Sequence, residues 1–468
     1  MTTLRAGHAS VAARSAGLKR ELGLTDLVFT QILFIVGLPW VGVAAKQGPA
    51  HVIFWLVALV LFYVPSAVVV IYLNRLMPLE GGLYQWAKLG FNELVGFLVA
   101  WNLWLFAILN TSEIGLQVTQ YLVYVMGPSI EGLAGSRWFI GLVSTAILGA
   151  LVIVTVLGLG VGKWVHKAGG ALMVATFGAV IVLPWLNVRY GTIAAFHPLA
   201  TAVPVVSIMS LNLLGKMGFG AFGGFEYVAI HAGECHNPVR SIAWSVVVAA
   251  PIIAVMFILG TSSVLALVPF DRIDLIAPIP QLLSEGFRPL GAASLAAPAG
   301  ILAMLCIRVA QSSVMFAGNT RLPMVAGWDG LLPQWFTRVH PRYKTPVNSI
   351  VFVGAATLAL SIAGLAGVGK QEAFQLLWNG SAIFYALTYL VMFALPLVGL
   401  GSRGAPAPLW LRACALSGLL MTLLFVALSI VPIVQVESRL LFAAKLSALI
   451  VVANAVGAAI FHGKRPPP

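Results

Sequence analysis

The chain has 468 residues, of which 60% are hydrophobic and only 9% are charged, and its mean hydropathy is +0.98. Soluble domains carry about 25% charged residues, so this composition excludes a soluble globular protein and indicates a membrane protein. The formal charge of +13 does not indicate nucleic-acid binding, because the basic residues are scattered over short loops. The three cysteines lie too far apart for a zinc spacing or a disulfide framework.

Residues 1–23 are polar and basic and lack the short apolar core of a signal peptide, so we expect a tail there. Apolar segments long enough to cross a ~30 Å hydrocarbon core as helices then follow along the chain. We expect twelve of them, at 24–46, 51–74, 82–125, 137–160, 164–187, 205–233, 241–268, 293–321, 347–367, 372–397, 408–431 and 439–461. The third is too long for one perpendicular crossing, which predicts a long tilted helix that protrudes into the cytoplasm.

The distribution of Lys and Arg predicts the orientation of these spans. An even number of spans puts both termini on one side, and placing them inside leaves most of the 27 basic residues in inner loops and tails. This bias fits the positive-inside rule. We therefore predict a multi-pass protein of the cell membrane with cytoplasmic tails at residues 1–23 and 462–468.

Two spans are interrupted by glycine and proline in their middle. The first contains Gly37, Pro39 and Gly42, and the sixth contains a run of glycines that ends at Gly223 and Gly224. Spans one and six occupy the same place in two five-helix halves, and paired breaks of this kind predict an inverted-repeat transporter with its site at the midplane. The alternative is that these glycines only let helices approach closely.

Three stretches carry a family resemblance. "FGAFGGFEYVAIHAGECHNPVRSI", "PLEGGLYQWAKLGFNELVGFLVAWNLW" and "NTRLPMVAGWDGLLPQWFTRVHPRYKTPVNS" occur in this order along the chain. Together they resemble the sixth helix, the second loop with the third helix, and the helix-eight-to-nine stretch of the amino acid–polyamine–organocation (APC) transporters. The resemblance implies an all-α membrane protein with a five-plus-five inverted repeat (the LeuT-like, or APC, fold). The implied parts are a transporter domain over 24–461, with repeat one at about 24–187, repeat two at about 205–397, and two extra helices at about 408–461.

The resemblance also implies an amino acid or amine substrate, bound between the breaks of helices one and six. By position, the implied substrate-binding residues are Val36, Gly37, Leu38, Phe222, Gly223, Gly224 and Phe225. Helix six further supplies Glu226, where family members carry an acid proposed to sense protons.

The sequence departs from the family pattern at three places. Pro39 has no N–H to offer a substrate carboxylate, which leaves fewer backbone donors in the helix-one turn. Thr176 stands where proton-coupled relatives often carry a lysine. Gly220 stands where some relatives carry an aromatic gate, which predicts a roomier outer vestibule.

Charged residues within spans usually have partners and mark functional sites. Glu226 either titrates as the coupling group or caps the inner half of helix six. Glu113 and Lys216 lie at similar depth, so we expect a structural or gating pair, and Arg308 is the alternative partner of Glu113 or the partner of an anionic substrate.

Uncharged polar and aromatic residues supply the remaining candidates. Ser312 and Ser313 could offer hydroxyls to a sodium ion, or bond back to the preceding helical turn. Trp101, Asn379 and Ser381 are further substrate-site candidates. His231, Glu234, Cys235 and His236 have the residue types of a metal site, but the cluster is short, and we expect no metal and no cofactor.

The sequence therefore predicts a secondary transporter of an amino acid or related amine, working by alternating access as a proton-coupled symporter or antiporter. The alternatives are an uncoupled exchanger, a sodium-coupled symporter and, less favoured, a membrane-embedded enzyme, for which no convincing catalytic constellation is found. Its expected partners are a small-molecule substrate, protons or sodium, and the lipid bilayer, with no nucleic acid. A monomer and a homodimer both fit.

Overall fold

The computed structural model describes residues 18–275, 277–292, 294–364, 370–399, 407–431 and 438–464. Helices dominate these ranges, and the β-structure recorded there is an isolated bridge between Leu22 and Cys235. The α-helices are α2 Leu24–Ile35, α3 Leu38–Ala45, α4 His51–Ala58, α5 Val64–Leu76, α6 Leu83–Gly90, α7 Glu93–Ser112, α8 Ile114–Met126, α9 Glu131–Ala134, α10 Arg137–Leu157, α11 Leu159–Arg189, α12 Ile208–Gly215, α13 Pro238–Leu267, α14 Pro278–Phe287, α15 Ala296–Asn319, α16 Arg321–Trp328, α17 Val347–Gly364, α18 Lys370–Ala394, α19 Leu409–Ser429 and α20 Arg439–Lys464. Short 3-10 or π-helical segments are η1 Gly48–Ala50, η2 Leu59–Tyr63, η3 Pro128–Ile130, η4 Lys216–Ala221, η5 Tyr227–Glu234, η6 Phe270–Arg272, η7 Gln334–Thr337 and η8 Leu395–Gly399.

The apolar helices agree with most of the predicted spans. Within the described ranges, nine helical segments are long and apolar enough to cross a membrane, and α2 with α3 makes a tenth that is bent by 46°. The predicted span 205–233 is divided into α12, η4 and η5, and the predicted span 347–367 contains the shorter helix α17. The count of twelve therefore stays a prediction.

The third predicted span is not one continuous helix. Residues 82–125 form α6, α7 and α8, and the side chain of Asn92 caps α7 by accepting a hydrogen bond from the Val95 N–H at 3.0 Å. The membrane-crossing part begins only at Glu93. The prediction of one long tilted helix over the whole segment is wrong at its start, because Asn92 is a strong helix-initiating residue.

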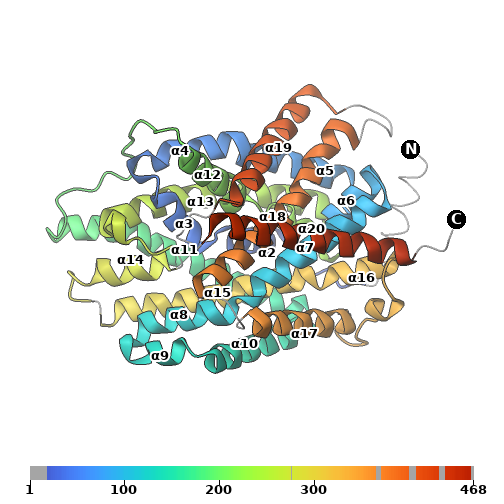
Figure 1. The fold of residues 1–468 in the computed structure, drawn as a ribbon, viewed down its shortest axis with the longest axis horizontal. Helices are drawn as coiled ribbons and strands as arrows, with labels where there is room; N and C mark the ends of the chain where they lie inside the picture. The colour runs from blue at the N-terminus through green and yellow to red at the C-terminus, as the bar shows by residue number, and fades with distance from the viewer. Residues whose placement is uncertain are drawn as a thin grey trace.

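The long helices form one bundle in which distant parts of the sequence pack together. α7 packs against α18, α11 against α15, and α2 against α13, while α10 and α17 lie together on one side (Figure 1). α19 packs on α5 and α12, and α20 packs on α7 and α18. The added C-terminal helices therefore cover the outside of the bundle.

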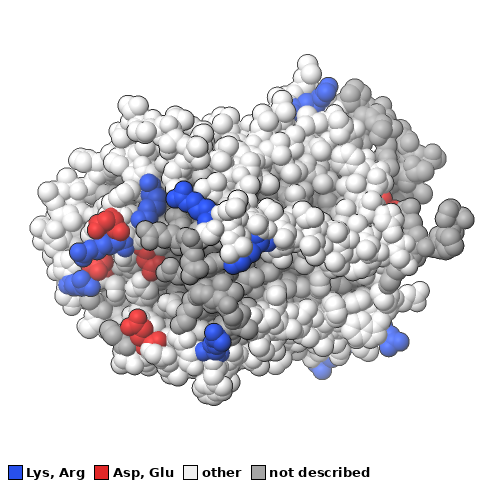
Figure 2. All heavy atoms as spheres, viewed as in Figure 1, with Lys and Arg blue, Asp and Glu red and all other residues white. Residues whose placement is uncertain are grey.

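The outer surface of the bundle is largely apolar. Most of the face in Figure 2 carries neither acidic nor basic side chains. Large hydrophobic residues such as Trp138, Ile153 and Val451 are more than 60% exposed. Such a surface is expected to face lipid.

The loop before α6 is held against the end of the sixth predicted span. The Gly81 N–H donates to the Ile230 carbonyl at 3.0 Å, and Gly82 has φ of +45°. A Cβ atom on Gly82 would lie 2.8 Å from the carbonyl carbon of Ala229. Only glycine permits both this backbone conformation and this approach.

We predict that Gly82→Ala destabilises the protein more than Gly127→Ala does. Both glycines have positive φ, but a Cβ on Gly127 would meet no atom within 4 Å. Each variant carries a backbone strain of about 1–3 kcal/mol, and Gly82→Ala adds a steric cost of about 1–3 kcal/mol. Thermal unfolding in detergent micelles measures the difference, and equal losses would contradict the close packing of this loop.

Candidate functional site

The first predicted span is broken between α2 and α3, as the glycine pattern indicated. The break leaves carbonyl groups at the end of α2 without helical partners. The side-chain amide of Gln311, on α15, donates to the carbonyls of Leu33 and Val36 at 2.9 and 2.8 Å. Gln311 thus satisfies acceptors that would otherwise be costly to bury in a membrane interior.

The sixth predicted span is broken between η4 and η5, again at its glycines. Gly224 has φ of +141°, and its N–H donates to the Tyr389 hydroxyl at 2.6 Å. A Cβ on Gly224 would lie 2.6 Å from Cγ1 of Ile35, so the two breaks approach each other closely. Tyr389 belongs to α18, and the second break is therefore stabilised by a different helix from the first.

A cavity of about 80 Å³ lies between these breaks. α7, α8, α15 and α18 complete its walls, and the ring of Tyr385 stacks on Phe106 at 4.1 Å. Five of the predicted substrate-site and coupling residues line it: Gly37, Leu38, Gly223, Arg308 and Ser381. Sequence reasoning did not select several other lining residues, among them Phe34, Trp40, Phe106, Asn110, Phe219 and Gln311.

The indole of Trp40 fills the space beside Gly220. A Cβ on Gly220 would lie 2.6 Å from the indole ring, and Trp40 also packs on Trp378 at 5.6 Å. The vestibule beside Gly220 is therefore closed by an aromatic residue from helix one, and the roomier vestibule expected from the sequence is not present there. The size of Trp40 and its place one turn after the break could have suggested this role.

The other predicted substrate-site residues lie behind the cavity wall or away from it. Val36 offers its carbonyl to Gln311, and Phe222 and Phe225 stack on Tyr63 at 4.1 and 4.8 Å. Trp101 donates to the Ala453 carbonyl of α20 at 2.9 Å, next to a separate apolar pocket of about 290 Å³.

Glu226 is buried directly behind the cavity. Its two carboxylate oxygens accept hydrogen bonds from the hydroxyls of Tyr385 and Tyr389. No Lys, Arg or His of the described chain forms an ion pair with it. Since Tyr385 lines the cavity, one side chain connects this carboxylate to the space where a ligand would lie.

The buried cation Lys216 does not have the neighbour that its depth in the predicted spans suggested. Nζ of Lys216 lies 3.5 Å from Oδ1 of Asn379 and over the Phe425 ring. Glu113 accepts from Gln117 at 3.4 Å and interacts electrostatically with Arg308. Within the described chain no ion pair joins Glu113 to Lys216, and Arg308, the alternative partner, acts on Glu113 from beyond ion-pair distance.

The residues considered for sodium and for helix-five coupling are buried around the first break. Oγ of Ser313 lies 3.3 Å from Nε2 of His166. Oγ of Ser312 has no hydrogen-bond partner within the described ranges, and Thr176 is buried on α11 and is not part of the cavity lining. Gln311, next to both serines, already occupies the carbonyls of the helix-one break.

Comparison with known proteins shows the family to which the chain belongs. The model of the amino acid permease family matches residues 22–453, nearly the whole chain. The chain belongs to the amino acid permease family. It is therefore an integral membrane protein and a transporter rather than an enzyme, and membrane transport of amino acids or related compounds is its function class.

The permease is similar to curated proteins over most of its length. It is 24% identical to an uncharacterized transporter of Legionella pneumophila, over 80% of each chain. It is 24% identical to a branched-chain amino acid permease of Bacillus subtilis, over 78% of this chain and 82% of the relative. It is 22% identical to a methylthioribose transporter of the same organism, over 77% of this chain and 78% of the relative.

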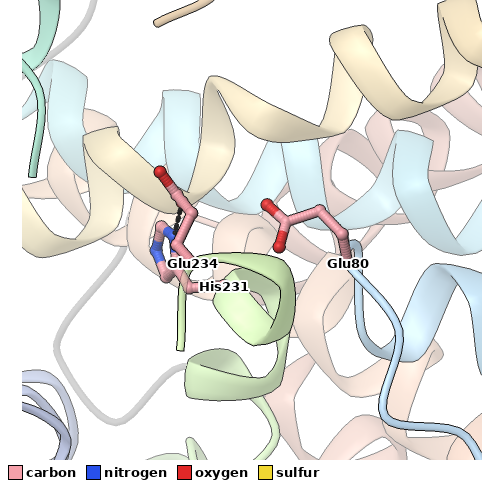
Figure 3. Close-up of side chains that lie close together, drawn as sticks. All are labelled: Glu80, His231 and Glu234. Atoms are coloured by element: carbon pink, nitrogen blue, oxygen red, sulfur yellow. Dashed lines mark hydrogen bonds and ion pairs between the residues drawn. The ribbon is translucent and has the colours of Figure 1, made fainter. Parts of the chain in front are cut away.

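A second polar cluster lies at the other end of η5 in the permease. Nδ1 of His231 lies 2.9 Å from Oε2 of Glu234, and Glu80 accepts from the Gly233 N–H at 2.7 Å (Figure 3). The Arg321 guanidinium donates to both oxygens of Glu234, at 3.0 and 3.3 Å. One atom from each of Glu80, His231 and Glu234 lies within 4.8 Å of the others, as in a metal site. The positive charge at this place is, however, already supplied by Arg321.

The two carboxyl groups of this cluster differ in charge. Burial raises the pKa of Glu80 well above its usual range, and the nearby Glu234 carboxylate raises it further. Burial also acts to raise the pKa of Glu234, but Arg321 and His231 outweigh it and lower that pKa to about 2. At neutral pH Glu234 is therefore the ionised partner of Arg321, and Glu80 is a neutral hydrogen-bonding group.

We predict that replacing Glu234 by glutamine costs much more stability than replacing Glu80 by glutamine. Glu234→Gln leaves the Arg321 guanidinium buried without its counter-charge and should cost about 3–5 kcal/mol. Glu80→Gln replaces an already neutral group, so its stability at pH 7 should change by less than about 1 kcal/mol or rise. Thermal unfolding in detergent at neutral pH compares them.

The pH dependence provides the control. A carboxyl whose pKa is raised in the folded state loses stability as pH rises above its unfolded pKa, because unfolding then releases a proton. Glu80→Gln should therefore flatten the fall in stability above about pH 4.5, the ordinary pKa of a glutamate. A steeper fall in the variant would contradict a neutral Glu80.

Proposed function

We propose that this permease is a secondary transporter that moves an amino acid or a related compound across the cell membrane by alternating access, coupled to protons through Glu226. The observation that carries the proposal is the cavity between the two helix breaks, with a buried carboxylate joined to its wall through Tyr385. A site between two broken helices that meet inside a bundle is the arrangement expected for alternating access.

The helix packing supports a five-plus-five inverted repeat. In such a repeat, each of spans one to five corresponds to the span five positions later. A contact between spans three and ten then corresponds to a contact between spans eight and five. The corresponding helices, α7 with α18 and α15 with α11, both pack together. The same correspondence relates α2 on α13 to η4 on η2, and both of these contacts are present. We further propose that both termini lie in the cytoplasm.

Proton coupling is favoured over sodium coupling by the donors at the first break. A sodium ion needs oxygen ligands with free lone pairs. Here the Gln311 amide points its N–H groups at the carbonyls of Leu33 and Val36, and His166 lies beside Ser313. Glu226, by contrast, is a titratable group next to the cavity that forms no ion pair with any described residue, as expected for a proton carrier.

Transport itself is tested by uptake into proteoliposomes. We expect saturable uptake of at least one labelled amino acid that is stimulated by an inward proton gradient and unaffected by replacing sodium with potassium. Uptake that requires the same amino acid inside, and ignores the proton gradient, would instead favour the exchanger, for which Thr176 in place of a lysine is the motive.

We predict that Glu226→Gln keeps ligand binding but loses most of the pH dependence of uptake. The amide is nearly isosteric and still accepts a hydrogen bond from a tyrosine, but it cannot take up a proton. Ser381→Ala is the matched control, because Ser381 lines the same cavity and does not titrate at working pH. The measurement is the pH–rate curve of all three proteins in identical liposomes, and superimposable curves for Glu226→Gln and wild type would end the assignment.

A further inference from the structure

Three of the backbone donors at the helix breaks are already used within the protein. The Gly37 N–H donates to the Ile35 carbonyl at 2.7 Å, and the Gly223 N–H donates to the Phe219 carbonyl at 3.0 Å. The Gly224 N–H donates to the Tyr389 hydroxyl, and Pro39 has no N–H. These three donors are therefore not free for a ligand carboxylate, which favours a side-chain donor in the cavity.

Several acceptors at the breaks also receive protein donors. The carbonyls of Leu33 and Val36 receive the Gln311 amide. Both oxygens of Glu226 receive tyrosine hydroxyls. Each of these oxygens keeps a further lone pair, but no acidic side chain is among the described residues that line the cavity, so a ligand ammonium meets no counter-charge at its wall.

Arg308 differs from all of these groups. It is the one charged residue among the described residues that line the cavity, and it is only 8% exposed. Its Nη2 donates weakly to Oδ1 of Asn110 at 3.4 Å, and its Nε has no hydrogen-bond partner in the described part of the chain. Glu113 compensates the charge from beyond ion-pair distance, and its own Oε1 has no hydrogen-bond partner among the described residues.

We propose that the permease binds its substrate by a carboxylate held on Arg308, and that a free α-ammonium group is not required. This rests on the proposed function and names the chemical class that the same cavity takes, namely organic carboxylates with an apolar body. A buried guanidinium with an unused N–H matches the two oxygens of a carboxylate. The rings of Phe34, Phe106 and Phe219 form the wall for the apolar part.

The first test uses the wild-type protein and three ligands with one carbon skeleton. Leucine carries both charges, isocaproate carries only the carboxylate, and isoamylamine carries only the ammonium. Phenylalanine, phenylpropanoate and phenethylamine repeat the series with an aromatic body. We expect the acids to compete with labelled amino acid uptake within about tenfold of the parent, and the amines to compete at least about tenfold less well. Amines that compete as well as the parent, with inactive acids, would overturn the proposal.

The second test changes the guanidinium. Arg308→Gln should weaken acid binding by about tenfold to a hundredfold, the usual value of hydrogen bonds to a charged group. Arg308→Lys keeps the charge but not the planar fork, and should recover part of the loss. Arg272→Gln is the control, because Arg272 is exposed outside the cavity. Binding is measured by ligand-induced thermal shift of each purified variant. Unchanged acid affinity in folded Arg308→Gln protein would overturn the proposal.

A failure of the transport function and a failure of carboxylate recognition by Arg308 would give different results. If proteoliposomes take up no amino acid, acid or amine, the proposed transport function fails and takes this inference with it. If an amino acid is transported but Arg308→Gln and the deaminated analogues behave contrary to expectation, only the carboxylate recognition by Arg308 fails.

Discussion

The arrangement depends on one constraint: backbone groups freed by a helix break inside a membrane must find partners within the protein. α15 meets this need at the first break through Gln311, and α18 meets it at the second through Tyr389. The same two helices line the cavity with Arg308 and Tyr385. The side chains that stabilise the breaks and those that face the cavity therefore move together when either helix moves.

The buried charges fall into two groups with different consequences. At the inner end of η5, Arg321 and Glu234 form a two-point ion pair, which is costly to open and suits a structural contact. Around the cavity, Arg308 and Glu226 have hydrogen-bond partners but no ion pair among the described residues. Binding of a ligand carboxylate to Arg308, or of a proton to Glu226, would then change the net charge around the cavity most.

Sequence reasoning located the breaks because glycine and proline mark them directly, and it placed Gly37 and Gly223 in the cavity. It did not find Gln311 or Trp40, because an amide that caps another helix and an indole that covers Gly220 are ordinary residues until the helices are assembled. Depth alone paired Glu113 with Lys216, but depth does not tell which way a helical residue points, and Arg308 is the cation that acts on Glu113. The break before Glu93 was readable from Asn92, a helix-capping residue inside an apolar run.

Tyr385 links proton and substrate in the proposed mechanism. While Glu226 is ionised, both of its oxygens accept hydrogen bonds from Tyr385 and Tyr389. Once protonated, Glu226 becomes a donor and its protonated oxygen becomes a poorer acceptor, so the hydrogen bond from one of the two tyrosines weakens. Tyr385 forms part of the cavity wall against Phe106, and Tyr389 holds Gly224 at the break. Weakening of either bond changes the cavity or the break, and reciprocity then requires that a bound substrate change the proton affinity of Glu226 by the same factor.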